Sequence, residues 1–140
     1  MSYLRLNPDA GDNQTLNVPK FASVSAMPTR TTGTDAGTFT GLALAAEMTK
    51  VSINGAANVD ITAIPLGVGG AINPAFKAAA QRAIAAVMIA AGYTDIDNLT
   101  VSIAIVDATP DTFTVTITHT GEATLTSVYI GGADKTLTRT

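Results

Sequence analysis

The chain contains no cysteine, no tryptophan and a single histidine, and charged residues make up 14% of its 140 residues. Without cysteine it cannot form disulfides, thiolate nucleophiles or cysteine-ligated metal sites. A typical globular domain has about 25% charged residues, so other groups must cover the surface of this chain. A surface of low charge is suited to close contact with partner proteins. We therefore expect a component of a crowded assembly rather than an enzyme.

The residues that are abundant instead are small and uncharged. The chain has 24 Ala, 22 Thr and 12 Gly residues, and its 8 Lys and Arg residues are outnumbered by 11 Asp and Glu residues, which gives a net charge of -3. Affinity for nucleic acids comes largely from basic side chains that contact phosphates. The charge balance therefore predicts no nucleic-acid partner.

Long apolar segments are also missing. The longest strongly apolar run, Ala83–Ala91, has nine residues, whereas a helix that spans a bilayer needs roughly 20, so we expect no membrane partner. The segment Met1–Arg5 is not followed by the apolar run of about seven or more residues that a secretory signal requires. We therefore expect synthesis in a cytoplasm.

Residues 1–40 lack periodicity and are expected to form an extended N-terminal arm. They contain three of the six prolines, and their apolar side chains are isolated from one another. Such a segment cannot offset its own ordering entropy by collapsing on itself. We expect the arm to dock on neighbouring proteins through apolar residues that include Leu16, Val18 and Phe21; the alternative is a terminal segment without a role. Residues 41–140 are expected to form a single α+β body that folds without the arm.

The first part of the body is predicted to contain a β-hairpin. Apolar and polar residues alternate in 50–53 and in 59–64, and between them stand Asn54 and Gly55, a pair typical of hairpin turns. Residues 42–47 fit either a strand or a short helix. The glycine-rich stretch that follows the hairpin is expected to form a loop.

A helix is predicted over residues 74–91. Asn73 can cap its first turn, Pro74 fits the first helical position, and Gly92 favours the left-handed conformation that often ends a helix. From Ala83 to Ala91 the helix is apolar on every side.

The apolar second half of this helix predicts a homo-oligomer. A helix that is apolar all round is buried all round, yet one sheet covers only one side of it. We expect the other side, especially Ala86, Ile89 and Ala90, to lie at or near a contact with a second subunit. The alternative is that the N-terminal half of the same chain covers this side.

Three strands are expected after the helix, in an antiparallel meander. Apolar and polar residues alternate through 99–105 and 112–120, and less cleanly through 123–130. The helix should lie across the apolar face, with the threonines of the second strand on the opposite face. The predicted fold class is therefore α+β, with one long helix packed on an antiparallel β-meander, an N-terminal hairpin and an extended N-terminal arm.

No motif for catalysis is complete in this sequence. His119 is the only histidine, and Asp107 or Asp111 would have to orient it in a Ser-His-Asp arrangement. No Gly-x-Ser-x-Gly nucleophile elbow is present. We expect His119 to lie at the rim of the core or at a subunit contact, without a catalytic role.

No motif for a metal ion or a cofactor is complete either. Asp95 and Asp97 imitate the start of a calcium loop, but Thr100 stands where that loop requires glycine. The glycines of 67–70 imitate a dinucleotide loop, but Ile72 stands where its third glycine belongs. We therefore expect no bound cofactor or metal, and the glycines are expected to allow a tight turn.

In composition and layout, the chain resembles the decoration, or cement, proteins of tailed-bacteriophage capsids. The shared features are the absence of cysteine, the low charge, the Ala- and Thr-rich composition, and an irregular arm joined to a small β-containing body. The resemblance implies a virion protein that binds the major capsid protein and stabilises the shell by bridging capsomers. It transfers no individual functional residue.

Other functions also fit the sequence. The chain could be a different virion component, from a tail, neck or fibre. It could instead be a small domain that binds a glycan or a peptide through the hydroxyls of the threonine row 112–120, although the β propensity of threonine explains that row adequately. An enzyme that uses scattered Asp and Ser residues is a third alternative. A shell protein should self-associate or occur at fixed stoichiometry in a particle, whereas a binding domain should be a monomer stabilised by its ligand.

Overall fold

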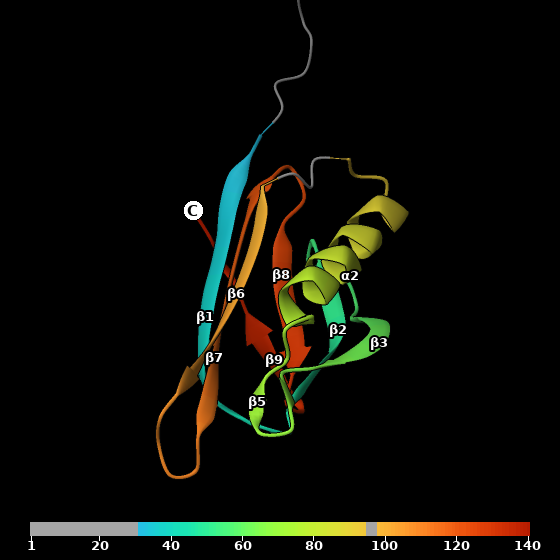
Figure 1. Cartoon of the computed structure of the whole chain (residues 1–140). Coiled ribbons are helices and arrows are strands. Elements are labelled where there is room, and N and C mark those ends of the chain that lie inside the picture. The colour runs from blue at the N-terminus through green and yellow to red at the C-terminus, as the bar shows by residue number, and fades with distance from the viewer. Residues whose placement is uncertain (1–30, 95–97) are drawn as a thin grey trace, which may run out of the picture. The chain divides into compact units, whose positions relative to one another are not determined.

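The computed structural model describes residues 31–94 and 98–140, which belong to one compact unit, Thr31–Thr140. The described part of this unit consists of antiparallel β-sheets and one helix (Figure 1), so the broad class α+β is confirmed. The elements are β1 (Gly33–Ala43), β2 (Glu47–Ile53), β3 (Val59–Pro65), β4 (Gly67–Val68), β5 (Ala71–Ile72), α2 (Phe76–Ala90), β6 (Leu99–Val106), β7 (Thr112–Gly121), β8 (Leu125–Ile130), β9 (Ala133–Thr136) and β10 (Thr138–Arg139).

The strands form two four-stranded sheets and a small ribbon of β4 and β5. Sheet A has the order β10-β1-β7-β6, and sheet B has the order β3-β2-β8-β9. Apolar side chains from both sheets belong to one continuous buried cluster, so the sheets pack face to face. The helix α2 contacts β6 of sheet A and β3 and β2 of sheet B, and it therefore covers the open side between the two sheets (Figure 1).

Period-two alternation places the apolar side chains of β7 in the core. Phe113, Val115 and Ile117 are fully buried, whereas the threonines between them are partly exposed. The opposing strands of sheet B contribute Met48, Val51, Leu125, Val128 and Ile130. The helix contributes a single stripe at helical spacing, formed by Phe76, Ala80, Ile84 and Met88.

The helix is shorter than predicted at its N-terminal end. It spans Phe76–Ala90, 15 residues, so the long helix expected over 74–91 is not confirmed. The side-chain oxygen of Asn73 accepts a hydrogen bond from the backbone N–H of Ala75 (3.0 Å), and its amide donates to the carbonyl of Pro65 (2.8 Å). Asn73 therefore stabilises the turn before the helix, and the N-cap residue is Ala75.

The predicted C-terminal cap of α2 is confirmed. Gly92 has a φ of 94°, and its N–H donates to the carbonyl of Ile89. The N–H of Tyr93 donates to the carbonyl of Met88 (3.0 Å). These two bonds are the pattern of a Schellman motif, which requires a residue that tolerates positive φ.

The predicted hairpin is confirmed, because β2 and β3 pair antiparallel. Asn54 and Gly55 both have positive φ, 56° and 73°, as primed hairpin turns require. Residues 42–47 form the end of β1, a turn and the start of β2. The glycine-rich stretch expected to be a loop contains the β4–β5 ribbon, which turns at Gly69 and Gly70.

The predicted three-stranded meander is wrong. β6 and β7 pair as expected, but β8 pairs with β2 and β9 instead of β7. After Gly121 the chain therefore crosses from sheet A to sheet B, and α2 does not lie across the face of one sheet. Alternation indicates which side of a strand is buried but not which strand is its neighbour. The β2–β8 register shifts at Ser52, so Leu125 and Val128 both face the core, which explains the uneven pattern of 123–130.

The boundary predicted between arm and body at residue 40 falls inside a strand. Gly33–Ala43 forms β1, which pairs with β7 and with β10 in the middle of sheet A. Residues 33–40 therefore belong to the body. The sequence hid this strand because its inward positions carry Asp35, Gly37 and Phe39 rather than a regular apolar row. The remainder of the predicted arm, residues 1–30, lies outside the described residues.

Candidate functional site

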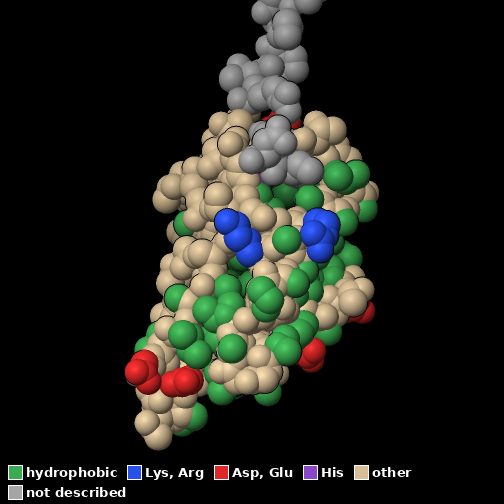
Figure 2. All heavy atoms as spheres, viewed as in Figure 1, with side chains coloured by type: hydrophobic (Ala, Val, Ile, Leu, Met, Phe, Trp, Pro, Cys, Tyr) green, Lys and Arg blue, Asp and Glu red, His purple; other side chains and the backbone are tan. Residues whose placement is uncertain are grey.

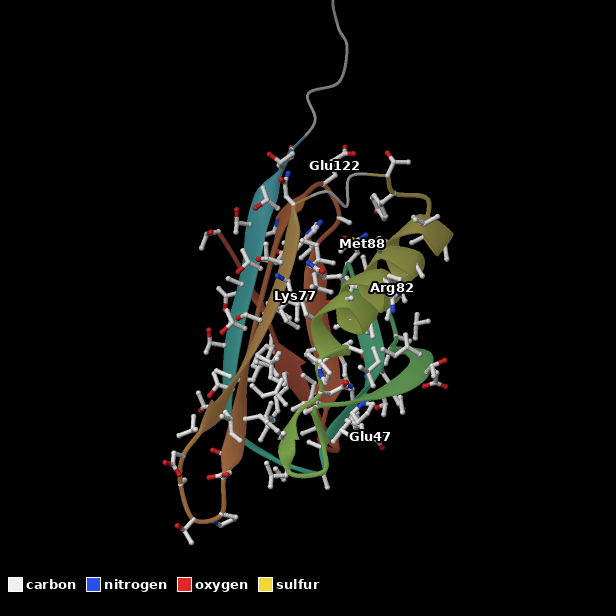
Figure 3. All side chains as sticks on the ribbon, in the orientation of Figure 1. Glu47, Lys77, Arg82, Met88 and Glu122 are labelled. Carbon is white, nitrogen blue, oxygen red and sulfur yellow. The ribbon has the colours of Figure 1, made fainter. Side chains whose placement is uncertain are left out.

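The residues predicted at a subunit contact lie together on the outer face of α2. Ala86 and Ala90 are exposed, and Ile89 is 57% exposed. The stripe that packs on the sheets runs through Ile84 and Met88 instead. Nothing in the described ranges covers Ala86, Ile89 and Ala90, so they form open apolar surface, and the two charged side chains of α2, Lys77 and Arg82, come before them along the helix (Figures 2 and 3). The other predicted contact residues lie outside the described residues: Leu16, Val18 and Phe21.

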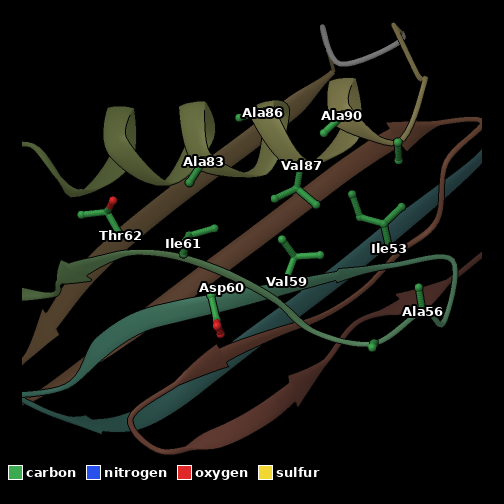
Figure 4. A pocket seen from close by; sticks show the side chains of 12 residues that line it. Ile53, Ala56, Val59, Asp60, Ile61, Thr62, Ala83, Ala86, Val87 and Ala90 are labelled. Atoms are coloured by element: carbon green, nitrogen blue, oxygen red, sulfur yellow. The ribbon is translucent and has the colours of Figure 1, made fainter.

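An apolar groove of about 590 Å³ lies between α2 and β3 (Figure 4). Alanines and Val87 form its helix wall, and larger apolar residues from β3 form the other wall. Asp60 is the one charged residue among the described residues that line this groove. Its side chain points away from the helix, and its carboxylate lies 3.7 Å from Nζ of Lys50. The main lining residues are Val59, Ile61, Ala83, Ala86, Val87 and Ala90.

The groove continues toward the start of α2 as a second hollow of about 300 Å³. The two hollows share Thr62 and Ala83 in their linings. The second hollow is bordered by Arg82, an exposed side chain of α2 (Figure 3). The combined groove therefore runs along the helix, with an acidic residue beside one half and a basic residue beside the other.

The strand wall of the groove, β3, is also an edge of sheet B. Its outer side has no strand partner among the described residues. A free edge can pair with another chain, but the β2–β3 register shifts between Met48 and Lys50, which breaks the regular ladder. Contacts at this groove are therefore expected to involve side chains more than an added strand.

A buried carboxylate forms the polar centre of the fold. Asp35 on β1 is fully buried, and both of its oxygens accept hydrogen bonds from Nη1 of Arg139 (3.0 Å each). Its Oδ2 also accepts the backbone N–H of Leu125 (2.9 Å) and lies 3.3 Å from Nδ1 of His119. A buried charge is costly unless it is paired and hydrogen-bonded. The cluster therefore ties β1, β7 and β10 of sheet A to the first residue of β8 in sheet B.

Arg139 extends this cluster to the crossing between the sheets. Its guanidinium donates to the carbonyls of Gly121 (2.6 Å) and Ala123 (3.2 Å). A Cβ at Gly33 would collide with the Arg139 side chain, so a larger residue there would require the guanidinium to move. The arginine thus fixes the segment that carries the chain from β7 to β8.

His119 is fully buried rather than at the rim of the core. Its carboxylate neighbour is Asp35, whereas Asp107 and Asp111 lie in the loop at the other end of β7. A histidine and an aspartate without solvent access cannot reach a substrate. We assign this cluster a structural role.

The outer face of sheet A is covered by hydroxyl and methyl groups. Threonine pairs contact each other across strands: the hydroxyls of Thr34 and Thr120 are 2.9 Å apart, and those of Thr38 and Thr116 are 3.2 Å apart. Such cross-strand pairs stabilise a sheet. The face extends the predicted threonine row of β7 to β1 and β6, which add Ala36, Thr100, Ser102 and Ala104.

The sequence offers incomplete motifs for a cation at 95–97 and for a cofactor at 67–70. Within residues 31–94 and 98–140, no group of three or more His, Asp and Glu side chains is arranged to hold a metal ion. Asp95 and Asp97 lie outside the described residues. None of the described helical structure is long and apolar enough for a membrane span.

Comparison with protein-family models, with curated proteins and with solved structures gives no match to this chain. Function is therefore inferred from the surfaces described above.

Proposed function

We propose that this chain is a structural virion protein, and specifically a capsid decoration protein that stabilises a phage shell by bridging capsomers. The observation that carries the proposal is the exposed apolar surface of α2 and the groove beside it. Leaving apolar surface in water costs about 25 cal/mol for each Å². Exposed apolar patches are found where proteins contact other proteins.

The use of charge in the fold supports the same function. Asp35 and His119 are buried inside the body, where they hold the two sheets together. The outer face of α2 offers alanine and isoleucine side chains with Arg82 among them. Binding by burial of apolar area needs no cofactor and no reactive group. The expected partners are the major capsid protein or other virion proteins, together with further copies of the chain, and the expected location is the virion.

A second candidate is a small domain that binds a glycan or a peptide. The observation that favours it is the hydroxyl-rich face of sheet A, which offers regularly spaced donors and acceptors. The cross-strand contacts of Thr34 and Thr38 already use part of this capacity. A tail, neck or fibre protein would use the same apolar surface as a decoration protein.

Mass spectrometry of purified virions tests the proposal. A decoration protein is expected in the particle at a fixed copy number close to that of the major shell protein, and shells assembled without it should open at a lower temperature. A far lower copy number would indicate a tail, neck or fibre protein instead. Absence from particles, together with a monomer whose melting temperature rises with a glycan, would overturn the assignment.

A further inference from the structure

A projecting apolar side chain and an apolar hollow lie on adjacent sides of α2. Ile89 is a large apolar side chain that projects from the helix and lies outside the groove lining. The groove on the adjacent side of the same helix is a hollow whose helix wall is formed by small residues such as Ala83 and Ala86. A single copy therefore presents both a projecting side chain and a hollow that can accept one.

An antiparallel pair of α2 helices would bring each projection to the hollow of the other copy. If the two helices cross at Ala86, residues at equal distances before and after that position face each other. Ile89 of one copy then faces Ala83 of the second copy, which lines the groove in both of its halves. Alanine at the crossing allows the helix axes to approach to about 8 Å.

The charges on α2 also fit this arrangement. The helix has no basic residue in its last turn, so no cation of its own complements the negative end of its dipole. The antiparallel crossing places Arg82 of one copy opposite Ala90 of the second copy, in that last turn. Each helix would thus receive a basic side chain where its carbonyl groups point outward. A parallel arrangement would instead place the two Arg82 side chains side by side.

We infer that the groove between α2 and β3 is the docking site for a second copy of this chain. The two α2 helices pair antiparallel about a two-fold axis at Ala86, and Ile89 of each copy is seated in the groove of the other. The interface is isologous, because each copy uses the same surface. The inference specifies the contact between copies that the proposed function expects, and it does not itself require a capsid.

Sedimentation velocity of the purified full-length chain tests the contact. The native chain is expected to form dimers or larger assemblies at micromolar concentration. Ile89→Lys should weaken association by at least about 100-fold, because each dimer buries two such side chains near its centre. The matched control is Val68→Lys on the β4–β5 ribbon, where the side chain is 59% exposed and lies outside the groove. The control should keep the mass of the native chain.

Disulfide trapping tests the orientation. The chain contains no cysteine, so Ala86→Cys introduces a single thiol, and mild oxidation should link two copies. Ala78→Cys lies on the same helix about 12 Å before the crossing, which separates the two thiols of an antiparallel pair by about 24 Å, well beyond the reach of a disulfide. After oxidation, the Ala78→Cys chain should run as a monomer in denaturing electrophoresis without a reducing agent.

A native chain that is monomeric at all concentrations would overturn the inference, as would an assembly that Ile89→Lys leaves intact. Equal cross-linking at positions 78 and 86 would show that the helices pair in parallel and would refute the two-fold arrangement. These outcomes are independent of the virion measurement. A chain that forms the trapped dimer but is absent from particles would refute the proposed function alone.

Discussion

Removal of the Asp35 carboxylate is expected to destabilise the fold by about 3–5 kcal/mol. The side chain is 0% exposed and receives two hydrogen bonds from Arg139 and one from the Leu125 N–H. Asp35→Ala deletes these acceptors and leaves the guanidinium and the N–H without their buried partner. Breaking a buried ion pair costs more than the pair itself contributes, because the remaining charge stays desolvated.

Two further variants separate charge from hydrogen bonding. Asp35→Asn keeps an oxygen that can accept the Leu125 N–H, so its cost should be smaller, about 1–3 kcal/mol. Combined with Arg139→Met, it closes a double-mutant cycle, and the two costs should be less than additive because the residues are in contact. The control is Asp60→Ala, whose side chain is 84% exposed beside Lys50. Exposed ion pairs contribute about 0–1 kcal/mol.

Urea unfolding followed by circular dichroism measures these differences. The urea midpoint should fall for Asp35→Ala, while the slope of the unfolding free energy against urea concentration stays unchanged. If Asp35→Ala costs no more than the Asp60→Ala control, the carboxylate is not a structural tie between the sheets. The cluster would then have a role other than stabilisation of the fold.

The elements that the sequence predicts correctly are those specified by local signals. The cap at Gly92 and the turn at Asn54 and Gly55 depend on the backbone freedom of single residues, and both are where the sequence places them. The alternation in β7 marks Phe113 as inward-facing and Thr114 as outward-facing without any knowledge of neighbouring strands. Local patterns of this kind identify elements but not their partners.

The elements that the sequence misses depend on distant partners. Asp35 and Arg139 are 104 positions apart and interact only after β1 and β10 become neighbours in sheet A. Asp35 stands directly opposite His119 in the β1–β7 register, a pairing that becomes visible only when β1 is recognised as a strand. The exposure of Ala86 and Ile89 agrees with the expected open face of the helix, and the contact itself stays a prediction.

The core provides the next prediction. Ile117→Ala should lower the free energy of unfolding by about 2–5 kcal/mol, because the side chain is fully buried, whereas Thr116→Ala should lower it by under about 1 kcal/mol. Equal urea midpoints for the two variants would mean that both faces of β7 are covered. Gly67→Ala should cost about 1–3 kcal/mol, because the new Cβ would lie 2.8 Å from the Phe113 ring and 3.0 Å from the Ala71 carbonyl, while the exposed neighbour Val68→Ala should leave the melting temperature nearly unchanged. Removal of residues 1–30 should preserve cooperative thermal unfolding, since both sheets lie within Thr31–Thr140, but removal of residues 1–38 should abolish it, because that truncation deletes Asp35 and the β1 residues paired with the second half of β7. If both truncated chains melt at the same temperature, β1 contributes nothing to the body, and the boundary at residue 40 would be correct after all.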